Sequence, residues 1–271
     1  MIFRLAGGVE NVLALTPVLA EWKRRNGLTV KVETRFPELL EGNTWVDEAA
    51  KFVDSEENHM ELGMIRWPLL VKSVTETYAE RVLGDTDMLC WRTEMVSSDA
   101  ELAGARERRP LGKVAMVSLG TEEIAEDMRR KVVSAVVSRG YFVVNLEEER
   151  LLRMRRAMIA VADLFVGIDG PDASLAYTTD VPAVVIHTWR DPCYFRPFRR
   201  GIPYVALAPS ERECSVGRIC LANNGFSEFG KVYGCGCSVE PRFKCRALEF
   251  DIMVRKALEN MLLEARWISE R

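Results

Sequence analysis

Residues 162–192, ADLFVGIDGPDASLAYTTDVPAVVIHTWRDP, contain the pattern that decides the fold. Leu164–Val166 and Ala183–Ile186 are short aliphatic runs, which is typical of strands buried on both faces of a parallel sheet. A polar loop and a short helical segment separate the two runs. Strand, helix and strand in this order predict an α/β fold.

Acidic residues follow both predicted strands. Asp169 and Asp172 come after the first strand, and Asp191 comes after the second. Ligands in open α/β sheets bind at the carboxyl ends of the strands, so we predict a ligand site here. A second interpretation stays open, in which Gly170 and Pro171 are turn residues and the aspartates cap the next helix.

The chain opens with the same kind of unit. Ile2–Leu5 is a predicted strand, Gly7 and Gly8 form a tight turn, and Asn11–Arg25 is a predicted helix. Backbone N–H groups at a helix start that follows a glycine turn suit a phosphate or a sugar. Pro17 lacks an N–H, so we expect it to kink the helix or to restart it.

The remaining elements follow from apolar spacing and turn residues. In the first half we expect strands at Leu28–Glu33 and within Val46–Val53, a helix within Met64–Leu83 and an edge strand at Asp87–Trp91. In the second half we expect strands at Val114–Leu119 and Tyr141–Leu146, and helices that begin near Thr121 and at Glu147. His59 is expected in a solvated loop, and His187 is expected to pack or cap at a strand end.

Several segments resemble glycosyltransferase family 9, which includes bacterial lipopolysaccharide heptosyltransferases. Residues 7–25, GGVENVLALTPVLAEWKRR, are similar to the family's opening G-G-I/M/V-G-D, with Thr16 and Pro17 in register with its T-P pair. Residues 169–176, DGPDASLA, resemble the family loop D-S/T-G-P-x-H-x-A. Residues 181–192 resemble its V-P-V-V-x-L-F-G-x-T-D-P segment, and the cysteine-bearing tail resembles the end of many members.

The resemblance implies two Rossmann-like domains that face each other across a cleft, with a shortened N-terminal domain. It also implies glycosyl transfer from a nucleotide-diphosphate sugar, such as ADP-heptose, to an acceptor hydroxyl of a glycan or another molecule, without a metal. We expect an acceptor-side domain at residues 1–104, a donor-binding domain at 105–245 and a closing helix at 246–271. The boundary lies in the polar stretch 97–112, which is typical of a linker.

The resemblance and the turn chemistry together indicate a set of donor-binding residues. These are Gly7, Gly8, Thr121, Asp169, Gly170, Ser174, Arg190 and Asp191. Residues 190–200 carry four arginines among aromatic residues. This segment suits either a diphosphate and a stacked base or a salt-bridged surface between domains.

The chain departs from the family at the position of the catalytic base. Where the family has Gly-Asp, this chain has Glu10 and Asn11. An amide cannot take a proton, so either Glu10 is the base while Asn11 orients the hydroxyl, or the activity is reduced or lost. A catalytically inactive nucleotide-sugar-binding or regulatory protein of the same fold is therefore the alternative, which Ser174 in place of the family's histidine also favours. A Rossmann oxidoreductase is disfavoured, because no G-x-G-x2-G follows either leading strand.

Composition and charge restrict the partners. The 271 residues are 48% hydrophobic and 28% charged, which is ordinary for a globular chain long enough for two domains. A formal charge of −3 and a pI near 5.7 provide no general attraction to nucleic acid, so no such partner is expected. The apolar start at residues 1–6 is too short for a signal peptide or a membrane span, so we expect a cytoplasmic protein without a transmembrane segment.

Seven cysteines in a chain expected in the cytoplasm indicate thiols or a metal site, not a disulfide framework. Five of them cluster near the end with the spacing C-x5-C-x14-C-x-C-x7-C, namely Cys214, Cys220, Cys235, Cys237 and Cys245. The paired C-x2-C arrangement of structural zinc sites is missing from this cluster. We therefore expect reduced thiols and no cofactor, with a zinc ion held by four of the five as the alternative.

Overall fold

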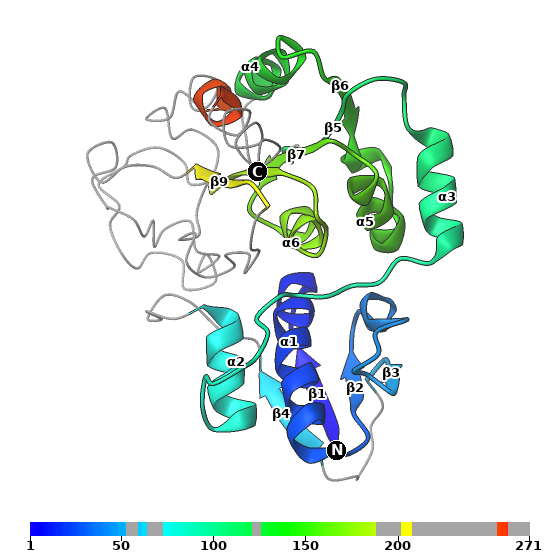
Figure 1. The fold of residues 1–271 in the computed structure, drawn as a ribbon, viewed down its shortest axis with the longest axis vertical. Helices are drawn as coiled ribbons and strands as arrows, with labels where there is room; N and C mark the ends of the chain where they lie inside the picture. Colours follow the sequence, from blue (N-terminus) through cyan, green and yellow to red (C-terminus); the bar gives the residue numbers. More distant parts are fainter. Residues whose placement is uncertain (53–58, 64–72, 121–125, 188–201, 208–253, 260–271) are drawn as a thin grey trace, which may run out of the picture. The chain divides into compact units, whose positions relative to one another are not determined.

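The computed structural model describes residues 1–52, 59–63, 73–120, 126–187, 202–207 and 254–259 (Figure 1). These residues divide into two compact units, the first within residues 1–102 and the second from residue 103 onward. Each unit contains one parallel sheet. The prediction of an α/β protein with two parallel sheets is therefore confirmed.

The first unit is built on a four-stranded sheet with the strand order β3-β2-β1-β4. Neighbouring strands all pair in parallel. Its elements are β1 (Ile2–Ala6), α1 (Val9–Asn26), β2 (Lys31–Thr34), the 3₁₀ turn η1 (Pro37–Leu40), β3 (Glu48–Ala50), β4 (His59–Gly63) and α2 (Val74–Leu83). Trp22 of α1 makes a T-shaped contact with Phe3 of β1, with ring centroids 5.3 Å apart. α2 packs beside α1 (Figure 1).

The central strand of this sheet alternates between an apolar and a charged face. Phe3 and Leu5 are fully buried on one face. Arg4 lies between them on the other face, opposite Glu33 of β2. The Arg4 Nε donates to the Glu33 carboxylate at 2.7 Å, so an ion pair links neighbouring strands on the polar face.

β4 was not predicted, because only Leu62 of the segment HMELG is both strongly apolar and buried. His59 begins this strand and is half-buried, so its expected place in a solvated loop is wrong. The His59 Nε2 lies 2.8 Å from the Glu61 carboxylate and 3.2 Å from the Arg4 guanidinium. The charged face of the sheet thus provides partners for this histidine.

A glycine lies at each end of α1. Gly8 is the N-cap and has an extended backbone. Gly27 is the C-cap at φ 65°, and its N–H donates to the Lys23 carbonyl at 2.8 Å. Glycine adopts this left-handed conformation without a steric penalty, so Gly27 ends the helix.

α1 continues through Pro17 from Val9 to Asn26, so the expected restart at this proline is not observed. A proline inside a helix leaves the carbonyl four residues earlier without its N–H donor. Here the Thr16 hydroxyl donates to that carbonyl, on Leu13, at 2.7 Å. A buried threonine thus replaces the hydrogen bond that Pro17 lacks. The same hydroxyl also accepts from the Glu94 N–H at 2.9 Å.

The second unit is built on a five-stranded parallel sheet with the order β6-β5-β7-β8-β9. Its strands and helices are β5 (Val114–Ser118), α4 (Glu126–Val137), β6 (Phe142–Asn145), the 3₁₀ turn η2 (Leu146–Glu148), α5 (Leu152–Ala160), β7 (Leu164–Ile168), α6 (Pro171–Tyr177), β8 (Ala183–Ile186) and β9 (Tyr204–Leu207). β5, β7 and β8 are almost entirely buried, as expected for central strands of a parallel sheet.

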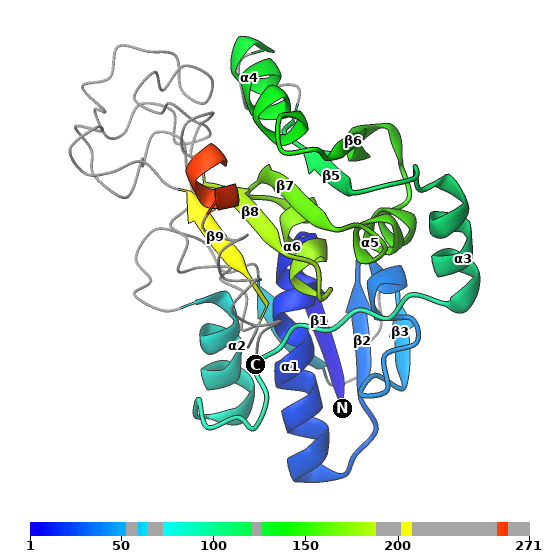
Figure 2. The same ribbon diagram turned by 45° about the horizontal axis from the view of Figure 1, so that its top comes forward.

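Helices cover both faces of this second sheet. Figures 1 and 2 show α4 and the helical residues 254–259 on one side, and α5 and α6 on the other. Val254 and Leu258 belong to the same buried cluster as Val132 and Val136 of α4. A segment more than a hundred residues beyond α4 therefore completes the core of this unit.

One expectation near the boundary between the units is wrong. Asp87–Trp91 forms no strand; instead the Arg25 side chain donates to the Asp87 carbonyl, and Leu89 is exposed. The polar stretch 97–112, which was predicted to be a linker, contains a helix, α3 (Asp99–Arg108). Ser98 and Glu101 each accept from the other's backbone N–H, which is the capping box of a helix start.

No helix within the described ranges is both long and apolar enough to cross a membrane.

Candidate functional site

Each sheet has a point at which the strand order reverses. In the first unit the chain runs outward from β1 to β3 and then places β4 on the other side of β1. In the second unit β6 lies on one side of β5 and β7 on the other. Open α/β sheets bind ligands at the carboxyl ends of the strands at these points. The predicted glycine turn follows β1 and the predicted aspartate loop follows β7, so both lie at such a point.

The turn after β1 brings the strand end very close to the first turn of α1. A Cβ atom on Gly7 would lie 2.6 Å from the Cβ of Asn11, so only glycine fits there. A Cβ on Gly8 would lie 2.8 Å from the Glu10 carboxylate. The Gly8 carbonyl accepts from the N–H groups of Asn11 and Val12 at 3.1 and 3.2 Å. The side chains of Glu10 and Asn11 therefore border the same two-glycine turn.

Glu10 and Asn11 are both buried, with 7% and 6% of their surfaces exposed. The hydroxyl of Tyr78, which lies in α2, donates to the Asn11 Oδ1 at 2.9 Å. Tyr78 is fully buried, and this burial raises the pKa of its phenol far above the usual value. The phenol therefore keeps its proton near neutral pH and remains a hydrogen-bond donor to Asn11.

A buried polar cluster lies at the reversal point of the second sheet. Ser118, the last residue of β5, donates to the Asp172 carboxylate at 2.7 Å. The Arg155 Nη1 donates to both oxygens of the same carboxylate at 2.9 and 3.1 Å. Asp172 is 6% exposed and lies in the first turn of α6. Its charge is therefore compensated by an arginine from α5.

The loop after β7 contains the predicted donor residues. Asp169 is 6% exposed, and its N–H donates to the Ile186 carbonyl of β8 at 3.0 Å. Gly170 is the N-cap of α6, and a Cβ atom there would meet no other atom within 4 Å. Ser174 is buried in α6, and its N–H donates to the Gly170 carbonyl. These three residues thus occupy one loop and helix start.

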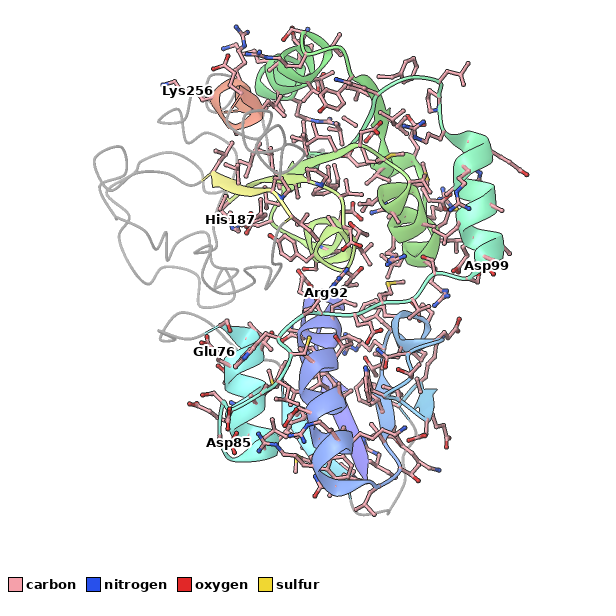
Figure 3. The ribbon with its side chains drawn as sticks, in the orientation of Figure 1. Glu76, Asp85, Arg92, Asp99, His187 and Lys256 are labelled. Carbon is pink, nitrogen blue, oxygen red and sulfur yellow. The ribbon has the colours of Figure 1, made fainter. Side chains whose placement is uncertain are left out.

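His187, labelled in Figure 3, follows β8 and is 2% exposed. Its ring Nε2 lies 3.2 Å from the Tyr204 hydroxyl, and its backbone N–H donates to the Leu207 carbonyl of β9. The Tyr204 hydroxyl also lies 3.2 Å from that of Tyr177 in α6. This packing agrees with the expectation of a packed histidine at a strand end.

Other predicted site residues lie outside the described residues. These are Thr121, Arg190, Asp191 and the five clustered cysteines, Cys214, Cys220, Cys235, Cys237 and Cys245. Across the part of the chain that the structure describes, no group of three or more His, Cys, Asp or Glu side chains could hold a metal ion. Cys90 has a free and exposed thiol.

Two side chains at these sites were not predicted from the sequence. Tyr78 follows Asn11 by 67 residues, and Arg155 precedes Asp172 by 17. Both belong to helices whose apolar spacing indicates packing and not chemistry. The capping box around Ser73 does locate the start of α2, but it carries no information about what Tyr78 contacts.

No family model and no curated protein matches the sequence. Solved structures do match over nearly the whole chain. A glycosyl transferase family 9 protein from Veillonella parvula matches at a TM-score of 0.67 and 14% identity, over 97% of each chain. E. coli ADP-heptose lipopolysaccharide heptosyltransferase II matches at 0.65 and 12%, over 98% of this chain and 99% of that chain. The iron-containing dodecameric glycosyltransferase TibC from enterotoxigenic E. coli matches at 0.66 and 11%, over 97% and 76%.

The fold is that of the glycosyltransferase family 9 heptosyltransferases. The motif resemblance and the fold therefore agree, although they rest on different observations. Asn11, which the motif resemblance aligns with the family's aspartate, has its amide oxygen hydrogen-bonded to Tyr78. Ser174, which the same resemblance aligns with the family's histidine, is buried.

Proposed function

We propose that the protein is a glycosyltransferase that moves a sugar from a nucleotide-diphosphate sugar to an acceptor hydroxyl. The observation that carries this proposal is the match of nearly the whole chain to heptosyltransferase structures. The donor that we favour is ADP-heptose, because one matching structure, that of TibC, is a complex with ADP-D-β-D-heptose. The burial of Glu10 and Asp169 at the two reversal points adds support, since ligands of α/β sheets bind at such points.

On the acceptor side, we assign the base to Glu10 and the orienting role to Asn11. The acceptor oxygen attacks the anomeric carbon of the donor as the bond from that carbon to the diphosphate oxygen breaks. The acceptor proton passes to the Glu10 carboxylate, and the bonding electron pair leaves with the diphosphate. Base catalysis of this kind is worth about 10²–10⁴ in rate.

On the donor side, we assign sugar and phosphate binding to the loop that contains Asp169, Gly170 and Ser174. Arg155 provides a cation beside this loop. Its Nη1 and Nε are hydrogen-bonded within the protein, and its Nη2 has no partner among the described residues. A guanidinium held in this way suits a phosphate oxygen, which would be stabilised as the diphosphate leaves. The roles of Gly7, Gly8, Thr121, Arg190 and Asp191 in donor binding stay predictions.

The second candidate is a nucleotide-sugar-binding protein of the same fold without catalysis. Asn11 favours it, because an amide cannot act as a base. Both candidates predict binding of the donor, and only the first predicts transfer.

A screen of nucleotide sugars for thermal stabilisation, followed by a transfer assay, distinguishes these two candidates. We expect ADP-heptose to raise the melting temperature, and Asp169→Asn to lower donor affinity at least tenfold, which is the effect of about one lost hydrogen bond to a charged group. Asp180→Asn is the matched control, because Asp180 is exposed beyond the other end of α6. Unchanged affinity in folded Asp169→Asn would move the donor site elsewhere, and binding without transfer would favour the second candidate.

A further inference from the structure

The side-chain amide of Asn11 is only half satisfied within the protein. Its Oδ1 accepts from the Tyr78 hydroxyl at 2.9 Å. Its Nδ2 has no hydrogen-bond acceptor among the described residues, although the residue is only 6% exposed. This nitrogen is not among the fully buried side-chain atoms that lack a hydrogen-bond partner, so it can be reached from solvent and is open to a ligand.

The unpaired amide nitrogen lies at the turn between β1 and α1. The Nδ2 would be 3.3 Å from a Cβ atom on Gly7, so it lies against the glycine turn. Gly8, the N-cap of this 18-residue helix, has no side chain that could cap the first-turn N–H groups. The turn therefore combines the positive end of a helix with a side-chain donor, and both suit an oxygen atom.

Tyr78 determines which end of the amide faces the turn. If the amide were rotated by half a turn, Nδ2 would donate to the phenol oxygen, and the phenol hydrogen would lose its acceptor. Burial raises the pKa of Tyr78, so the phenol cannot escape this cost by losing its proton. The orientation with Oδ1 toward Tyr78 is therefore the stable one, and Nδ2 is left for a ligand.

We propose that Tyr78 is a positioning residue that holds the Asn11 amide with its Nδ2 toward a neutral hydroxyl of the acceptor substrate. This inference rests on the proposed transferase function. A carboxylate or phosphate of the acceptor is disfavoured, because Glu10 places a negative charge beside the same turn. A hydroxyl fits both neighbours, since its oxygen accepts from Asn11 while its hydrogen is donated to Glu10.

The test uses Asn11→Asp alone and combined with Tyr78→Phe, and it needs no activity. Carbon NMR of the carboxyl introduced at position 11 reports its pKa. A phenol donor stabilises the charged form, so adding Tyr78→Phe should raise this pKa by about one unit or more. Thr75→Val in the same background is the matched control, because it removes another buried hydroxyl from α2. Equal pKa values with and without the phenol would overturn the proposal.

Kinetics then test the role in transfer. Tyr78→Phe should lower kcat about tenfold, the value of one hydrogen bond, with little change in the donor KM. In an Asn11→Ala background, Tyr78→Phe should have no further effect on kcat, because Tyr78 acts through the amide. An equal loss in both backgrounds would mean a general structural role and would contradict the proposal. If no variant and no parent transfers any sugar while the pKa shift is present, the proposed function fails and the positioning contact stands.

Discussion

Position 11 illustrates how one buried side chain separates two possible functions of the same fold. The turn at Gly7 and the hydroxyl of Tyr78 would serve a carboxylate at this position as well as they serve the amide, because both accept the same hydrogen bond. The two side chains differ in what they offer the substrate, because a carboxylate can take a proton whereas an amide can only accept and donate hydrogen bonds. The question of activity therefore depends on Glu10, the carboxylate next to Asn11.

Replacing Glu10 by glutamine removes the carboxylate and keeps the shape of the side chain. If Glu10 is the base, we expect a loss in turnover of about 100-fold or more, with little change in melting temperature. A transfer assay and a thermal melt on the same samples measure both quantities. If Glu10→Gln transfers at the parent rate while Asn11→Asp transfers faster, the chain has lost its base and retains only residual activity.

At the scale of a single element, the end of α1 is held by a buried carboxylate. Glu21 is 4% exposed and accepts from Arg24 and Arg25, and Arg25 also pairs with Asp85 after α2. The hydrogen bond from Arg24 is the largest cause that lowers the pKa of Glu21, from 4.5 to about 2. The stability of this helix end therefore depends on whether the Glu21 carboxylate is ionised.

Acid titration should reveal this connection. Because the pKa of Glu21 is lower in the folded state, its stabilisation is fully present above about pH 4.5 and is lost as the pH falls toward 2. We expect Glu21→Gln to cost about 1–3 kcal/mol near neutral pH, and the difference from the parent to shrink below pH 4.5. Urea unfolding at several pH values measures this difference.

Glu48→Gln is the control for the acid titration, because its ion pair with Lys31 is exposed and such pairs contribute at most about 1 kcal/mol. A difference between Glu21→Gln and the parent that stays constant from neutral pH down to pH 2 would contradict the assignment.

At the scale of the whole molecule, the second unit depends on a segment far along the chain. Residues 254–259 are helical, and Val254, Ala257 and Leu258 are buried in the core that α4 and the central strands form. Lys256, labelled in Figure 3, is exposed on the same segment. The other residues of the predicted closing helix, 246–253 and 260–271, lie outside the described residues, so that helix stays a prediction.

Removing one core side chain from this segment should destabilise the second unit. Leu258→Ala should lower the free energy of unfolding by about 2–5 kcal/mol, as buried leucines do elsewhere. Lys256→Ala should change it by less than about 0.5 kcal/mol, since its side chain is exposed. Chemical denaturation of the full chain compares the two variants, and equal midpoints would mean that the segment is not part of this core.

The local elements could be predicted from the sequence because their causes are local. β8 matches the predicted run Ala183–Ile186, and β7 extends the predicted one by two residues. Continuous aliphatic runs form buried strands wherever helices cover both faces of a sheet. The glycine turn after β1 and the loop at Asp169 were predicted for the same reason, since turns are encoded by neighbouring residues.

Prediction failed where distant contacts outweigh the local pattern. Asp87–Trp91 has the composition of a strand, but Arg25 binds its backbone and no strand among the described residues pairs with it. β4 was missed because its polar residues His59 and Glu61 contact Arg4 of β1, in place of the apolar alternation of an ordinary strand. Such partners come from other elements, so no window of sequence contains them.

The sequence by itself determined the two α/β units, the turns that carry Glu10, Asn11 and Asp169, and the resemblance to a transferase family. The tertiary structure alone decided that Tyr78 holds the Asn11 amide and that Arg155 compensates Asp172. Periodicity records which face of a helix is buried, because burial recurs with the helical turn. It does not record which side chain of a second helix arrives there, because that depends on how the helices pack on the sheet.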